Sequence, residues 1–119
     1  MDFNKFFKSF HYALQGVKSA FGEQNMRVHL LGAICALITA FLTRLSTLEW
    51  CILVLVIALV FAAEMFNTAI EKVVDLASPE FHPLAKAAKD IAAGAVLVIA
   101  CMSVIIGILI FIPKWMSLL

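Results

Sequence analysis

The sequence predicts an all-α integral membrane protein, with an amino-terminal interfacial helix followed by three transmembrane helices. Hydrophobic residues make up 64% of the 119 positions and charged residues only 14%, far from the composition of a soluble domain. The net charge of +1 argues against a nucleic-acid partner. We therefore expect one membrane domain that covers residues 1–119.

Residues 3–21 are expected to form an amphipathic helix that lies in the membrane interface. Apolar side chains recur at helical intervals from Phe3 to Phe21, and Lys5, Lys8 and Lys18 lie between them. A helix that packs on a soluble partner is the alternative. Lysines placed among phenylalanines favour a position at the lipid headgroups.

Three later segments are candidate membrane spans. Residues 28–43 are short, about 24 Å at the rise of an α-helix, so Arg27 and Arg44 at their ends would snorkel to the headgroups. Residues 48–69 and 91–112 are long enough to cross, and Pro113 is expected to end the last helix. Lysine and arginine cluster before the first span and between the second and third. This predicts a cytoplasmic amino terminus and an external carboxyl terminus.

A polar edge begins inside the second span. It consists of Glu64, Asn67, Glu71 and Asp75, which share one helix face. An acid in a transmembrane helix costs roughly 2.5 to 3.5 kcal/mol on insertion scales, so Glu64 is a functional candidate. The second and third spans are expected to form an antiparallel hairpin. Counted outward from Ser78 in its connection, Asp90 is expected at a depth similar to that of Glu64. Cations of one leg of this hairpin are then expected near anions of the other leg.

These side chains suit phosphoryl transfer to a lipid alcohol. Several carboxylates near one another, including Glu23, need a cation between them, and oxygen ligands suit Mg²⁺. Magnesium held by one or two carboxylates takes further ligands from phosphate, which indicates a nucleotide. The cations available to its phosphates are Lys5, Lys8, Lys86 and Lys89. Glu64 lies near the headgroup boundary, where it can act as general base toward a lipid hydroxyl, while Asn67 orients the carboxylate or a phosphate.

The run from Glu64 to Asp75, followed by Ala88, Lys89 and Asp90, resembles the signature of the prokaryotic diacylglycerol kinase family. The similarity covers nearly the whole chain. It is greatest to the Gram-positive branch, which implies an undecaprenol kinase that uses ATP and Mg²⁺, with diacylglycerol as the alternative acceptor. The family fold implies a homotrimer whose active sites are shared between neighbouring subunits.

The resemblance also implies roles for individual residues. Glu64 matches the catalytic base, and Glu23 and Glu71 match the carboxylates that hold the metal. The positions that match residues around the phosphates and the nucleotide are Asn67, Lys89, Asp90, Asp75 and Tyr12, together with Lys5, Lys8 and Gly16. The alignment before Glu23 needs a shift of one residue. Lys86 falls beside a position that cannot be assigned.

Two other classes of function remain open from the residues alone. A non-enzymatic membrane assembly or pore protein would share the size and the spans, but it would not need this set of polar groups. A proton-coupled carrier would place an acid in a span, but it should not bind a nucleotide. Outside the polar edge, His29 is expected at the interface or beside a helix end, and Glu49 is expected to be a solvated loop acid.

Overall fold

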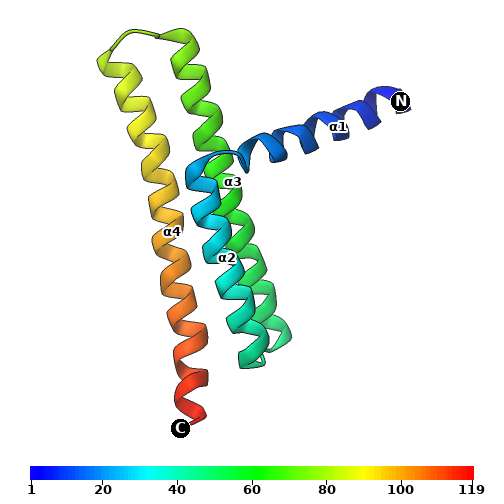
Figure 1. Cartoon of the computed structure of the whole chain (residues 1–119), viewed down its shortest axis with the longest axis vertical. Helices are drawn as coiled ribbons and strands as arrows, with labels where there is room; N and C mark the ends of the chain where they lie inside the picture. Colours follow the sequence, from blue (N-terminus) through cyan, green and yellow to red (C-terminus); the bar gives the residue numbers. More distant parts are fainter.

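The computed structural model describes residues 1–119 and consists of four helices joined by short loops. The helices are α1 (Phe3–Ala20), α2 (Gln24–Thr43), α3 (Thr47–Ala77) and α4 (Pro83–Ser117). Helices α2, α3 and α4 are long and apolar enough to cross a membrane. They run alongside one another, and α1 projects sideways from them (Figure 1). This confirms the predicted all-α membrane fold.

Helix α1 is almost entirely exposed. The Asp2 side chain caps its first turn by accepting hydrogen bonds from the backbone N–H groups of Asn4 and Lys5, at 3.0 and 3.3 Å. Ala20 is its one buried residue. Just beyond the helix, the ring of Phe21 packs edge-on against Phe61 of α3, with centroids 5.4 Å apart. The amphipathic helix is thus attached to the bundle only near its carboxyl end.

Helix α2 begins earlier than expected. It runs for 20 residues from Gln24, which gives about 30 Å, the thickness of a typical hydrocarbon core. Arg44 then adopts a left-handed conformation, with φ of 59°, and Ser46 is the N-cap residue of α3. Ser46 and Glu49 form a capping box, so Glu49 belongs to the first turn of α3 and is not a loop acid.

The carboxyl ends of α2 and α4 and the amino end of α3 are held together by polar contacts. Lys114 Nζ lies 2.9 Å from Glu49 Oε1 and donates to the Arg44 carbonyl at 3.3 Å. Trp115 Nε1 donates to Thr43 Oγ1 at 3.4 Å. The expectation that Pro113 ends the last helix is wrong, because α4 continues to Ser117. Proline removes one hydrogen bond, and these contacts hold the final turn in place.

The other ends of α3 and α4 extend past the junction of α1 and α2 as a long hairpin (Figure 1). Pro83 opens α4, and His82 caps it by accepting from the backbone N–H of Leu84 at 3.1 Å. Only 12 of the 119 residues are buried within the chain, so lipid or other subunits must cover most of its apolar surface.

Candidate active site

Glu64 and Asn67 are the two buried polar residues of the chain. They are 3% and 4% exposed and lie one turn apart on α3. Both line a cavity of about 250 Å³ between α2, α3 and α4. The other residues around it are Asn25, His29, Ala93, Val96, Leu97 and Ala100. The cavity is therefore apolar on the α4 side and polar on the α2 and α3 sides.

The Glu64 carboxylate has one charged or titratable partner. His29 Nε2 of α2 lies 3.5 Å from Glu64 Oε2, and the two side chains are 21% and 4% exposed. The contact joins α2 to α3 beside the cavity and holds the Glu64 side chain at its edge.

Asn67 connects the buried part of the polar edge to its half-buried part. Its Nδ2 donates to Glu71 Oε1 at 3.2 Å, while its Oδ1 is buried without a hydrogen-bond partner. An unpartnered buried carbonyl costs about 1 to 3 kcal/mol, so a ligand that donates a hydrogen bond there would be favoured. A substrate hydroxyl or a water molecule bound to a metal ion has the required chemistry.

The acidic residues do not form a ready-made metal centre within one chain. No three histidine, cysteine or carboxylate side chains come close enough together to hold an ion. Glu23, at the start of α2, lies 3.7 Å from Lys72 Nζ, and Lys72 directly follows Glu71 in α3. The oxygen donors of Glu23 and Glu71 suit Mg²⁺ that takes most of its ligands from phosphate and water.

A second polar cluster lies further along the hairpin, around a hollow lined by Asp75, Lys86, Lys89 and Asp90. Lys89 Nζ lies 2.5 Å from Asp75 Oδ1, which confirms that a cation of one leg meets an anion of the other. Lys86 lies 2.5 Å from Asp90 within α4 itself.

The expected shared depth of Glu64 and Asp90 is wrong. Asp90 lies level with Asp75, whereas Glu64 faces the Val96 to Ala100 region of α4. The reason is the connection 78–82, whose five residues belong to neither helix and shift the register of the two legs. Asp75 is eleven residues from Glu64, about 16 Å along α3, so the two clusters are separate within one chain.

The α1 residues with predicted roles do not reach either cluster in the single chain. Lys5, Lys8, Tyr12 and Gly16 are all exposed on the helix that projects from the bundle (Figure 1). Tyr12 is 64% exposed, and a Cβ added at Gly16 would meet no atom within 4 Å. Their predicted roles therefore depend on an arrangement that a single chain does not provide.

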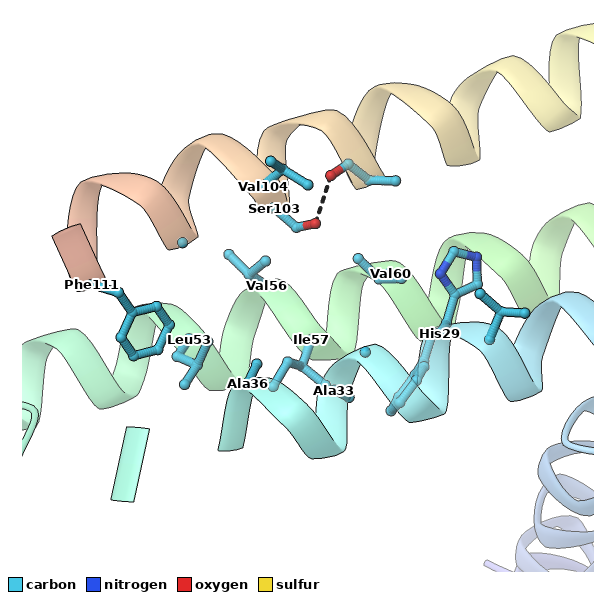
Figure 2. Close-up of a pocket in the computed structure, with 15 residues that line it drawn as sticks. His29, Ala33, Ala36, Leu53, Val56, Ile57, Val60, Ser103, Val104 and Phe111 are labelled. Carbon is cyan, nitrogen blue, oxygen red and sulfur yellow. Dashed lines mark hydrogen bonds between the residues drawn. The ribbon is translucent and has the colours of Figure 1, made fainter. Parts of the chain in front are cut away.

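An apolar groove of about 380 Å³ adjoins the Glu64 cavity. His29 and Ala100 line both hollows. Figure 2 shows the groove between α2, α3 and α4, with His29 near one end and Phe111 at the other. A polar cavity beside an apolar groove suits an amphipathic molecule with a hydroxyl at one end and a hydrocarbon chain behind it.

The contact of His29 with Glu64 is not among the interactions predicted from the sequence. Asn25 and His29 both line the cavity, and they are four residues apart on the first turns of α2. This spacing places them on one face, which was an available signal. It does not show which face of α3 they meet, because that depends on the packing of the two helices.

Comparison with known proteins identifies the family. Residues 11–111 match the prokaryotic diacylglycerol kinase family. The chain is 52% identical to the undecaprenol kinase of Bacillus subtilis (strain 168) over 95% of its length and 93% of that protein. It is 42% identical to a diacylglycerol kinase of Synechocystis, over 93% of this chain and 65% of the relative. With the Escherichia coli (strain K12) diacylglycerol kinase the identity is 30%, over 87% and 85% of the two chains. The chain belongs to the prokaryotic diacylglycerol kinase family.

Proposed function

We propose that this protein is a membrane lipid kinase that transfers the γ-phosphoryl group of ATP to undecaprenol. The single observation that carries the proposal is the buried Glu64, which shares its cavity with an unpartnered Asn67 oxygen beside an apolar groove. Family membership and the name of the Bacillus subtilis relative support this acceptor. Diacylglycerol is the second candidate, since other relatives carry that name.

In this proposal Glu64 acts as general base. Its carboxylate takes the proton of the lipid hydroxyl while the hydroxyl oxygen forms a bond to the γ-phosphorus. The bond between that phosphorus and the bridging oxygen breaks, so that ADP leaves. Asn67 contributes to substrate binding: its Oδ1 accepts a hydrogen bond from a water molecule beside the lipid hydroxyl, whose own proton goes to Glu64, and its Nδ2 holds Glu71 in place. Burial strengthens these interactions because water does not screen them.

Glu23 and Glu71 would hold Mg²⁺, which supplies charge neutralisation at the phosphates. Their oxygen donors suit this metal, and Glu71 is already oriented by Asn67. Asp75, Lys89 and Asp90 would bind the phosphates and the nucleotide further along the hairpin. Lys89 would exchange its contact with Asp75 for a phosphate oxygen.

The site would be completed in a homotrimer. Lys5, Lys8, Tyr12 and Gly16 lie on the projecting α1, and a neighbouring subunit would bring them to the nucleotide. The exposure of these four residues, which reach neither polar cluster in the single chain, supports such an assembly. We further propose a single membrane domain in the cytoplasmic membrane, with the amino terminus inside and the carboxyl terminus outside, as the lysine distribution favours.

The test compares the two lipid alcohols directly. Purified protein in one detergent, with Mg²⁺ and ATP, is given undecaprenol or diacylglycerol at equal mole fraction, and the phosphorylated lipid is measured. We expect undecaprenol to be phosphorylated faster. A clear preference for diacylglycerol would contradict the choice of acceptor, and phosphorylation of neither lipid would contradict the kinase assignment.

A further inference from the structure

We propose that His29 is a positioning residue that orients the Glu64 carboxylate through its Nε2–H group, an inference that rests on the proposed kinase function. His29 would hold Oε2 of Glu64 and leave Oε1 to receive the proton of the lipid hydroxyl. His29 itself would not touch the phosphoryl group. Neither its position in the sequence nor the family resemblance gave it this role.

The first support is the distance and the burial of the pair. His29 Nε2 lies 3.5 Å from Glu64 Oε2, and the Glu64 side chain is 4% exposed. A typical N–H···O hydrogen bond is shorter, with N and O about 2.9 Å apart. The hydrogen bonds of catalytic groups are often long without substrate and shorten when the substrate is bound. The pair connects α2 to α3, so the packing of these two helices places the imidazole against the carboxylate.

The second support is the state of the neighbouring cations. Lys72 is paired with Glu23, and Lys89 is paired with Asp75. The remaining nearby cation, Arg27, directs its Nε to the Phe21 carbonyl at 3.4 Å. None of them contacts Glu64, and His29 is the one basic side chain within 4.0 Å of its carboxylate.

The third support is the place of His29 between the two hollows. It lines the cavity of Glu64 and also the apolar groove (Figure 2). A lipid whose chain lies in the groove would bring its hydroxyl past His29 to reach Glu64. An imidazole suits this boundary because it is aromatic and can donate a hydrogen bond without carrying a charge.

The test uses two substitutions of the same residue. His29→Leu removes the donor, and His29→Gln restores an N–H near the position of Nε2. We expect kcat to fall about 10- to 100-fold in His29→Leu, with the KM values for ATP and undecaprenol changed less than about threefold. We expect His29→Gln to recover most of this loss. His11→Leu, on the exposed face of α1, is the matched control.

The results separate a positioning role from simple packing. A kcat of His29→Leu equal to that of the parent would overturn the proposal. So would a His29→Gln variant as slow as His29→Leu, because the donor would then not be what matters. Thermal unfolding in the same detergent shows whether each variant is folded.

A second measurement does not require activity. The imidazole ¹⁵N signals of the three histidines are recorded by NMR in the parent protein and in Glu64→Gln. We expect the His29 signals to shift, and those of His11 and His82 to remain. Unchanged His29 signals would overturn the contact itself. If the parent protein phosphorylated no lipid alcohol, the proposed function would be refuted, whereas the contact of His29 with Glu64 could still be measured.

Discussion

Replacement of Asn67 by leucine separates the stability of the buried polar edge from its function. Asn67 donates one hydrogen bond to Glu71 and leaves Oδ1 without a partner. Loss of a hydrogen bond to a charged group costs about 1.5 to 3 kcal/mol, whereas removal of a buried unpartnered carbonyl gains about 1 to 3 kcal/mol. These terms oppose each other, and the leucine side chain has the same branching and the same number of heavy atoms as asparagine. We therefore expect Asn67→Leu to change the free energy of unfolding by less than about 1.5 kcal/mol.

The activity of the same variant should respond much more strongly. If Asn67 Oδ1 accepts a hydrogen bond from a water molecule beside the reacting hydroxyl, and Nδ2 orients Glu71, the substitution removes interactions of about 1.5 to 3 kcal/mol from the transition state. This corresponds to a fall of about 10- to 150-fold in kcat/KM.

The assay measures ADP release with undecaprenol in detergent, and thermal unfolding is measured on the same sample. Phe66→Leu is the control, because Phe66 is adjacent in the sequence but 71% exposed. An Asn67→Leu protein whose unfolding temperature lies far below that of the parent, but whose folded fraction keeps the parental rate, would refute this reasoning. Asn67 would then serve packing alone.

Three further predictions concern the phosphate contacts, the metal ion and the orientation of the chain in the membrane. Lys89→Met should raise the KM for ATP about tenfold, because the cation that would exchange Asp75 for a phosphate oxygen is lost. Lys86→Met, which loses only a contact within α4, should keep a KM within about threefold of the parent, and steady-state kinetics with ATP varied compares the two variants. Removal of Mg²⁺ with EDTA should abolish activity, and Glu71→Gln should raise the Mg²⁺ concentration for half-maximal rate about tenfold; an unchanged Mg²⁺ titration would contradict its role as a ligand. In intact cells an impermeant thiol reagent should label Ser117→Cys but not Ser78→Cys, in a background without the native cysteines, and the reverse pattern would invert the proposed topology.

The elements of the fold could be predicted because they depend on local properties of the chain. Apolar runs of sufficient length located the spans, and alternation of lysine and phenylalanine located α1. Besides the early start of α2, two features of the helix ends were missed for identifiable reasons. The capping box of Ser46 and Glu49 was overlooked, although its spacing is visible in the sequence. Pro113 stays within a helix because Lys114 and Trp115 hold the final turn, and such contacts are not local.

The site was harder to predict because it depends on how the helices pack. The spacing of Glu64, Asn67 and Glu71 was enough to place them on one face of α3, and two of them are buried. The level of Asp90 was not predictable by counting residues, because the connection between the two legs changes their register. The partner of Glu64 was missed for a related reason, since no periodicity within α2 fixes its rotation against α3.

The most direct test of the account is the rate of phosphate transfer from radiolabelled ATP to undecaprenol in the parent and in Glu64→Gln. Glutamine keeps the size of the side chain but cannot take a proton at pH 7. We predict undecaprenyl phosphate from the parent, and a rate reduced at least about 100-fold in a Glu64→Gln protein that remains folded. A folded Glu64→Gln protein that phosphorylates undecaprenol at the parental rate would contradict the central claim that Glu64 is the general base.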